Sequence, residues 1–381
     1  MAGKRKADDV SWAEDWQVSA WLARSEVASA DLHVSEPREV AWFSRDAKRN
    51  LQYGSRAMLR SFYLPSSEVD LNIGFDKYVA KLESDVGLEP VLHALAQSQY
   101  DTKKEADVIT YRNNLLKIGL TPYSKKDPWE IRACNVDGTV FLDIVKLEEP
   151  PPNEQTQRFL YYGYRFEQAC TGDVAGEDPV NANEEFCTIV RLRIGTTRIL
   201  LSAEIDCEDK SFKKETDTHM GRYIELKTSR KPDRPQHFRT LRRFKYLKFW
   251  LQSYLAGTST IYLGFRNDQG LVVKIERIRT KDLPKLCGQE WNPWVCLNFI
   301  NETLSTISHE LKTHGEIRIR YIPALDRVVV DPYDPARDGC SFRERVAKAV
   351  SEIGNLTESH AETGDQTEDG GARMENGDGH Q

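Results

Sequence analysis

Long apolar runs are missing from this chain. No stretch approaches the ~18 consecutive apolar residues that a membrane-spanning helix needs, so the sequence predicts a protein without membrane spans. The N-terminal segment holds no apolar core of the kind that a secretory signal peptide carries. The seven cysteines are odd in number, scattered, and never spaced as C-x-x-C, which argues against a disulfide framework and against a zinc ribbon. A reducing, intracellular compartment is therefore expected.

A large net charge is also missing: 53 basic and 59 acidic side chains leave −6 over 381 residues. The acidic excess lies entirely at the C-terminal end. Residues 355–381 hold seven acids and one arginine, so the preceding residues 1–354 are neutral overall. Because this end is rich in Gly, Asp, Glu and Thr and has almost no large apolar side chain, the sequence predicts an acidic disordered tail over 355–381.

Hydrophobic residues make up 39% of the chain, enough for one sizeable core. We expect a weakly ordered leader over 1–20 and a single domain over 21–354. In and beside the leader, Trp12, Trp16 and Trp21 are spaced to share one face of a short helix. The basic run Lys4-Arg5-Lys6 is consistent with part of a nuclear address, although such runs are common near termini.

Apolar periodicity predicts an α/β (α+β) fold with a central mixed, largely antiparallel sheet flanked by helices. Helices are expected over 76–95 (interrupted near 87–90), 154–170, 235–255, 292–314 and 341–354. Strands are expected over 108–118, 186–194, 197–206, 222–228, 261–265, 271–277, 317–321 and 327–330, with a hairpin over 136–145.

Two short acidic patterns lie on consecutive predicted strands. Glu204 and Asp206 stand two residues apart, as do Glu225 and Lys227, and residues two apart share one face of a strand. Each pair alone is also compatible with an exposed ion pair of little energetic value. Clustered carboxylates repel unless a cation compensates, and Mg²⁺ or Mn²⁺ is the natural ion where phosphate is the other ligand. The helix-borne Glu167 can complete such a metal site.

The predicted helix after these strands is strongly basic. Nine bases and one acid lie between Lys227 and Trp250. On a helical wheel Lys245, Lys248 and Gln252 share one arc, whereas an apolar sector, Phe244, Leu247, Leu251 and Leu255, is expected to face the core. A solvated basic face is the simpler interpretation. The cationic arc beside a carboxylate site instead predicts binding of a phosphate backbone.

Six short strings occur in order: G-Y-R-F-E-Q at 163–168, S-A-E-I-D-C at 202–207, Y-I-E-L-K-T-S at 223–229, F-W-L-Q-S-Y at 249–254, G-F-R-N at 264–267 and W-N-P-W-V-C-L-N-F at 291–299. Together they resemble the eukaryotic decapping exoribonuclease (DXO) family, including the fungal branch that partners the nuclear 5′→3′ exoribonuclease. The E-x-D and E-x-K pairs also match the D-(D/E)-x-K arrangement of nucleases. The similarity extends from about residue 41 to about residue 345.

The resemblance implies a role for each matching residue. Glu167, Asp206 and Glu225 would be metal ligands, together with the backbone carbonyl of Leu226, and Glu204 would be a ligand or orient a metal-bound water. Lys227 would contact the scissile phosphate and water, and Gln252 would position one of them. Arg112 matches an upstream arginine that contacts the RNA 5′ end. Catalysis would thus involve Glu204, Lys227 and Gln252, and substrate binding would involve Arg112, Lys227, Lys245, Lys248 and Gln252.

The function implied is a nuclear, Mg²⁺- or Mn²⁺-dependent hydrolase of RNA 5′ ends in RNA quality control. Members of the family variously release pyrophosphate from 5′-triphosphate RNA, remove incomplete or NAD caps, and degrade RNA 5′→3′. Two alternatives stay open: a D-(D/E)-x-K-like nuclease acting on DNA, and a mainly non-catalytic subunit that activates a larger nuclear 5′→3′ exoribonuclease.

Overall fold

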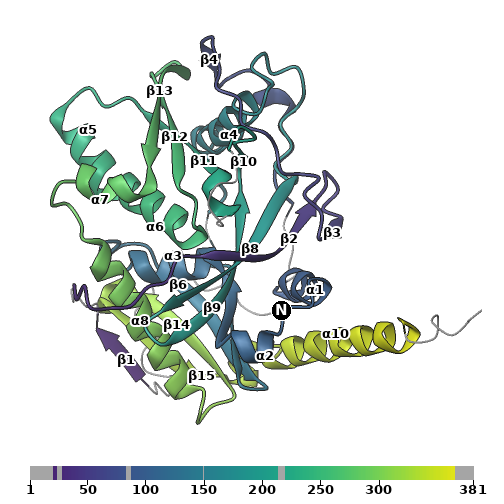
Figure 1. The fold of residues 1–381 in the computed structure, drawn as a ribbon. Coiled ribbons are helices and arrows are strands. Elements are labelled where there is room, and N and C mark those ends of the chain that lie inside the picture. The colour runs from purple at the N-terminus through teal and green to yellow at the C-terminus, as the bar shows by residue number, and fades with distance from the viewer. Residues whose placement is uncertain (1–19, 24–27, 83–86, 149, 213–218, 365–381) are drawn as a thin grey trace, which may run out of the picture.

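Two β-sheets organise the chain (Figure 1). The computed structural model describes residues 20–23, 28–82, 87–148, 150–212 and 219–364. In the ten-stranded sheet, neighbouring strands are antiparallel except that β5 runs parallel to both β7 and β9. The strands follow the order β1 (Ala20–Ala23), β15 (Arg327–Pro332), β14 (Glu316–Ile322), β6 (Trp129–Val136), β7 (Thr139–Val145), β5 (Val108–Tyr111), β9 (Thr197–Ile205), β8 (Glu185–Ile194), β2 (Arg38–Arg45) and β3 (Leu51–Tyr53).

A second sheet has five strands, in the order β10 (Cys207–Glu208), β11 (Tyr223–Arg230), β12 (Thr260–Arg266), β13 (Leu271–Arg279) and β4 (Val69–Asp70). Only β11 and β12 are parallel, because a helical crossover connects them. The predicted mixed, largely antiparallel arrangement is confirmed, but it is divided between two sheets, whereas the sequence predicts one central sheet.

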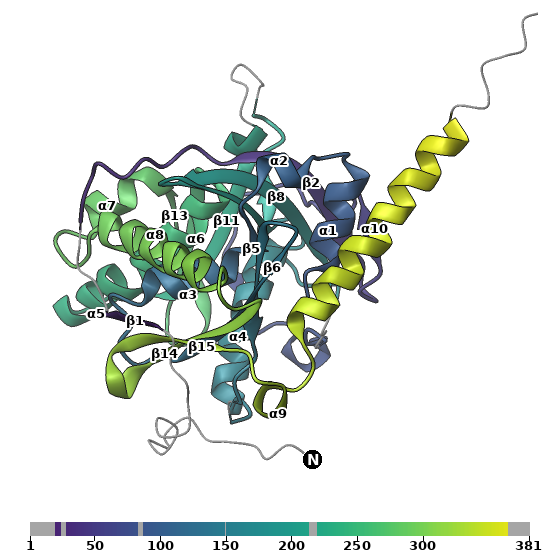
Figure 2. The same cartoon turned by 90° about the horizontal axis from the view of Figure 1, so that it is seen from below.

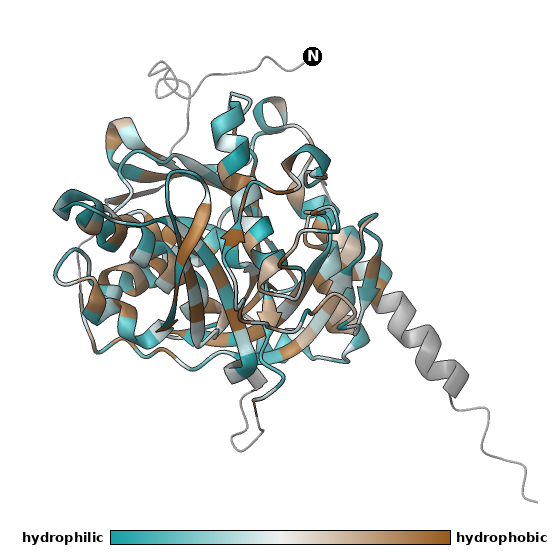
Figure 3. Ribbon diagram, turned by 90° about the horizontal axis from the view of Figure 1, so that it is seen from above, coloured by the Kyte–Doolittle hydropathy of each residue, from teal (hydrophilic) through white to brown (hydrophobic). Residues whose placement is uncertain are grey.

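Alternating residues of the large sheet face two different apolar layers. On β9, Ile199 and Leu201 face the layer formed with α3 (Arg112–Leu120), α6 (Leu247–Ala256) and α8 (Pro293–Glu310). Leu200 faces the other layer, which α1 (Glu89–Gln97) and α10 (Phe342–Gly364) cover. Figure 3 shows hydrophobic colour along the central strands and mostly hydrophilic colour on the loops. Both faces of the sheet are therefore buried.

The small sheet packs against α4 (Glu154–Ala169). The crossover between β11 and β12 consists of α5 (Pro235–Thr240), the π-helical η4 (Leu241–Tyr246) and α6. The remaining short helices are η2 (Phe75–Lys77), α2 (Thr102–Glu105), η3 (His219–Arg222), η5 (Thr280–Asp282), α7 (Leu283–Leu286), η6 (Pro323–Leu325) and α9 (Pro335–Asp338). Among the helices that the structure describes, none combines the length and apolar character needed to cross a membrane.

Most predicted elements are confirmed, including the 136–145 hairpin and the helices near 154–170 and 292–314. The strand predicted over 108–118 is wrong beyond residue 111. The β-branched run Val108–Thr110 ends there, and 112–120 forms α3, whose apolar residues recur at helical spacing. The helix predicted over 76–95 is reduced to η2 and α1, and residues 83–86 between them lie outside the described ranges.

Two further predictions need correction. Trp21 lies in strand β1, paired with β15, and not on a helix; Trp12 and Trp16 fall in the leader at 1–19, which lies outside the described residues. Phe244 was expected to face the core but is 51% exposed. It lies in the π-helical segment, whose wider turn shifts the side-chain positions relative to a regular wheel.

Helix α10 continues to Gly364, ten residues into the predicted tail, and its end extends away from the body (Figure 2). The Ala and Glu residues of this stretch favour a helix. The packing contacts lie near its start, where Phe342, Val346 and Ala349 are buried. Residues 365–381 lie outside the described ranges, so the disordered tail stays a prediction.

We expect deletion of 355–381 to leave the free energy of unfolding nearly unchanged, because the buried contacts of α10 precede the deletion. Phe342→Ala should lower it by about 3–5 kcal/mol, since it removes a ring that is 2% exposed. Urea denaturation of both proteins measures the difference. A large loss on truncation would show that the tail contributes to packing.

Candidate active site

The chain crosses from the large sheet to the small one at Asp206. Strand β9 ends at Ile205, and β10 begins at Cys207, where it pairs with Ile224 of β11. Glu204 lies at the end of β9 in one sheet, while Glu225 lies on β11 in the other. The crossing therefore brings the two acidic patterns together, although their strands belong to different sheets.

The carboxylate of Glu225 is the most enclosed group of the site, with the residue 1% exposed. Three donors surround it. The Lys227 ammonium pairs with Oε1, the Gln252 side-chain amide donates to Oε1 at 2.6 Å, and the Arg112 guanidinium lies 3.5 Å from Oε2. Burial opposes ionisation, but the charges of Lys227 and Arg112 outweigh it and lower the pKa of Glu225. This carboxylate is thus held in its charged form.

Asp206 and Glu167 have weaker compensation. Asp206 Oδ2 accepts the backbone N–H of Leu226 at 2.6 Å and lies 3.9 Å from the Lys227 ammonium. Burial, followed by the charge of Glu225, raises the pKa of Asp206 to about 7. Burial and the charge of Asp206 also raise the pKa of Glu167, on α4. The cluster therefore carries more acidic groups than its single lysine neutralises.

The site residues fit a hard divalent ion by their chemistry. Carboxylate and carbonyl oxygens are the ligands that Mg²⁺ and Mn²⁺ prefer, and added positive charge would stabilise the ionised forms of Asp206 and Glu167. Within the described ranges, no three Asp, Glu, His or Cys side chains already converge as a metal cage. Instead, the Lys227 ammonium lies between Glu225 and Asp206 and offsets their charge. The assignment of ligands stays a prediction.

The basic helix lies along the same face of β11. Gln252 contacts Glu225, and the Lys245 ammonium donates to Ser229 Oγ at 3.0 Å. Lys248 lies between Lys245 and Gln252 in sequence and is exposed. Partial loss of hydration, followed by the charges of Lys117 and Lys227, lowers the pKa of Lys248. The predicted cationic arc therefore borders the carboxylate cluster.

Lys81 is a site residue that sequence reasoning missed. Its ammonium lies 2.6 Å from Glu185 and 3.5 Å from Glu204, so it links a buried carboxylate of β8 to the acid at the end of β9. Lys81 and Glu204 also line a cavity of about 650 Å³ together with Arg112. Nothing in the local pattern around Lys81 marks it, because its partners are more than one hundred positions away.

The structure thus brings Glu167, Asp206, Glu225, Lys227, Gln252 and Arg112 into one cluster, with Glu204 on its Lys81 side. This arrangement is typical of the PD-(D/E)XK nucleases. In that class an acid at the end of one strand lies close to a Glu-x-Lys pair on another strand. The family model described as "RAI1 like PD-(D/E)XK nuclease" matches residues 35–331, and the chain belongs to this family.

Relatives in fungi and animals match most of the chain. The decapping nuclease RAI1 of Emericella nidulans is 31% identical over 329 residues, which cover 80% of this chain and 90% of the relative. The human decapping and exoribonuclease protein is 32% identical over 300 residues, covering 71% of this chain and 74% of the relative.

Solved structures share the fold. Rai1 of S. pombe has a TM-score of 0.72 at 25% identity, covering 83% of this chain and 99% of that one. The same protein has also been solved with 3′-FADP. Candida albicans Rai1 in complex with pU5 and Mn²⁺ has a TM-score of 0.74 at 21% identity, covering 89% and 99%. That last likeness concerns the fold alone.

The two buried acids predict opposite effects on stability. Asp206→Asn should stabilise the metal-free protein above pH 7, because ionising a group whose folded-state pKa is raised from 3.8 to about 7 costs folding free energy. The cost grows between about pH 4 and pH 7, so the gain should vanish at about pH 4. Glu225→Gln should instead destabilise by about 3–5 kcal/mol, since it leaves the charges of Lys227 and Arg112 without their buried partner.

Urea denaturation in chelator at pH 4 and pH 8 measures both effects. Glu208→Gln is the matched control, because Glu208 lies on the adjoining strand β10 and pairs with Arg222 outside the cluster. A destabilised Asp206→Asn protein at pH 8 would show that the acids are compensated without a metal.

Proposed function

We propose that this protein is a divalent-metal-dependent hydrolase of RNA 5′ ends that removes defective caps in RNA quality control. The observation that carries the proposal is the enclosure of Glu225 by Lys227, Gln252 and Arg112, next to Asp206 and Glu167. Membership of the RAI1-like family supports it.

Glu167, Asp206, Glu225 and the Leu226 carbonyl would hold Mg²⁺ or Mn²⁺, with Glu204 as a further ligand or as the residue that orients water. The bound ion would supply positive charge that activates water and stabilises the phosphate. Lys227 contacts the scissile phosphate. Gln252, released from Glu225, positions water or phosphate through its amide. Arg112 binds the 5′-terminal phosphate, where its guanidinium presents two parallel donors.

The substrates proposed are RNAs with 5′-triphosphate, incompletely methylated or NAD-type ends, with 5′→3′ exonuclease activity as a further property. Two relatives support parts of this proposal: S. pombe Rai1 was solved with the dinucleotide 3′-FADP, and Candida albicans Rai1, which shares the fold, was solved with pU5 and Mn²⁺. An RNA substrate also fits the exposed cations of the helical run that leads to Gln252.

The protein is proposed to act in the nucleus and to bind a nuclear 5′→3′ exoribonuclease, as the resemblance to the fungal branch implies. A purely activating subunit has no physical reason to keep several acids in a buried cluster, because their mutual repulsion costs folding free energy. The cluster thus supports catalysis alongside any partner role.

Purified protein with Mg²⁺ or Mn²⁺ should hydrolyse RNAs that carry triphosphate, GpppN or NAD ends, and release the 5′ group before shortening the chain. RNAs with methylated-cap and monophosphate ends complete the panel, and a DNA of the same sequence tests the DNA-nuclease alternative. Asp206→Asn and Lys227→Met should each lose at least about a hundredfold in rate, because the first removes a proposed ligand of the metal ion and the second removes positive charge next to the reacting phosphate. Glu208→Gln should retain the rate.

Full activity in excess chelator, or equal activity of Asp206→Asn, would contradict the proposal. Activity seen only when the exoribonuclease is added, and retained by Asp206→Asn, would favour the activating-subunit alternative.

Lys245 and Lys248 should contribute to RNA affinity by pairing with backbone phosphates. Removing one such lysine should reduce the slope of log affinity against log salt by ~0.7 for single strands, so the double variant Lys245→Ala/Lys248→Ala should lose ~1.4. Fluorescence anisotropy with labelled single-stranded RNA across a salt series measures the slope. Lys312→Ala removes an exposed lysine elsewhere and should keep it. An unchanged slope in the double variant would mean that this face of the helix contacts water and does not bind RNA phosphates.

A further inference from the structure

A groove of about 210 Å³ lies beyond the cationic arc, between the α5–η4 segment and the strands of the small sheet. Its lining includes Lys231, Phe238, Arg242 and Lys274. Glu276 also lines it and is paired with Lys274. None of these residues belongs to the carboxylate cluster, so the groove is a separate feature of the surface.

The groove lies at the end of a row of contacts between strand β11 and the crossover helix, and this row begins at the active site. Alternate residues of β11 share one face, and successive turns of the crossover helix face them. Gln252 is paired with Glu225, and Lys245 is paired with Ser229. Just beyond the end of β11, Lys231 lines the groove, and on the helical run Arg242 lines it too. From Gln252 to Phe238 the helical run is about 20 Å long, a distance that several nucleotides of single-stranded RNA span.

The cations between the active site and the groove can bind an anion, because neighbouring carboxylates do not offset their charge. Within the part of the chain that the structure describes, no carboxylate forms an ion pair with Lys231, Arg242, Lys245 or Lys248. Two other cations of the same helical run differ. Arg239 and Arg243 lie 3.1 and 3.8 Å from the carboxylate of Glu290, which offsets their charge. Two cations without a carboxylate partner among the described residues, Lys231 and Arg242, thus line the groove.

The ring of Phe238 is 44% exposed and lines the groove beside Lys231 and Arg242. An exposed aromatic ring between cations is the usual platform for an unpaired nucleobase, because every base offers a π-face and every nucleotide a phosphate. A duplex does not offer this contact, since its bases are stacked on one another. The pairing of ring and cations therefore favours single-stranded nucleic acid.

We propose that the Phe238 groove binds nucleotides downstream of the 5′ end of single-stranded RNA, with a base stacked on Phe238 and phosphates next to Lys231 and Arg242. The direction of the RNA rests on the proposed function, which places the 5′ end at Glu225 and Lys227. The groove then makes affinity depend on RNA length, because only RNAs that extend beyond the cationic arc reach it.

Equilibrium binding in chelator, where hydrolysis is stopped, tests the groove apart from catalysis. A 5′-phosphorylated decauridylate should bind the wild-type protein more tightly than a diuridylate. Phe238→Ala should reduce that length advantage about fivefold or more, which is the loss expected when one base–aromatic stack is removed. Arg242→Glu should reduce it as well and flatten its salt dependence. Both residues are at the surface, so neither change should unfold the protein.

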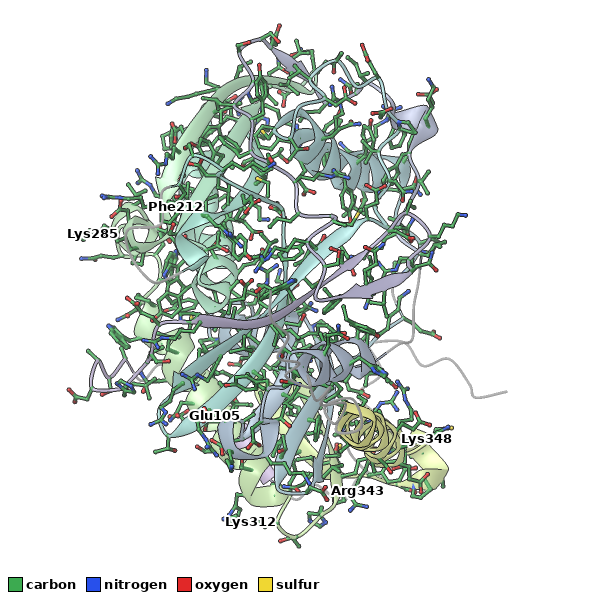
Figure 4. All side chains as sticks on the ribbon, turned by 45° about the vertical axis from the view of Figure 1, so that its right-hand side comes forward. Glu105, Phe212, Lys285, Lys312, Arg343 and Lys348 are labelled. Atoms are coloured by element: carbon green, nitrogen blue, oxygen red, sulfur yellow. The ribbon has the colours of Figure 1, made fainter. Side chains whose placement is uncertain are left out.

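Phe244→Ala is the matched control, because Phe244 is a similarly exposed ring on the same helical run and does not line the groove. Lys312→Ala is a remote charge control: Figure 4 shows Lys312 at the bottom of the molecule, well below Lys285, which neighbours the groove residue Leu286. Both controls should keep the wild-type length advantage.

Three results would overturn the inference: no length advantage in the wild type, equal losses in Phe238→Ala and Phe244→Ala, or equal affinity for double-stranded RNA of the same length. If the wild-type protein binds longer RNA more tightly but hydrolyses no 5′ end, the proposed function is refuted, whereas the inference that the groove binds RNA still holds.

Discussion

The site depends on one buried carboxylate and the three donors around it. Glu225 is reached by Lys227 from its own strand, by Gln252 from α6 and by Arg112 from the first turn of α3. A charge that is 1% exposed is tolerated only when such partners replace its hydration. The same interaction therefore neutralises the charge and fixes the positions of a strand and two helices that belong to different parts of the chain.

For the two neighbouring acids, the cost of burial outweighs the stabilisation by nearby positive charge. Asp206 and Glu167 lie close to Glu225 but share the one ammonium of Lys227, so burial raises the pKa of each. One carboxylate is kept charged by the protein itself, whereas an added cation would favour ionisation of the other two. This difference couples the chemistry proposed for the site to its folding energetics.

The crossover between β11 and β12 connects the site to the surrounding surface. Because β11 and β12 are parallel, the chain must return across the sheet, and the returning helix passes along the face that carries Glu225. The π-helical turn in Leu241–Tyr246 exposes Phe244, a residue that a regular wheel would bury. Topology thus places a cationic helix beside an acidic cluster, and Lys245 of that helix donates a hydrogen bond to Ser229 on the strand that carries Glu225.

Local sequence determined a great deal of this protein. The E-x-D and E-x-K spacing, the helical period of 154–170 and the concentration of bases after Lys227 depend only on near neighbours, so strand faces and helix faces follow directly from them. The division into two sheets, the helical start at Arg112, the exposure of Phe244 and the link from Lys81 to Glu204 did not follow. Each of these results from contacts between residues far apart in the chain, and only the tertiary structure decides which distant groups share one buried space.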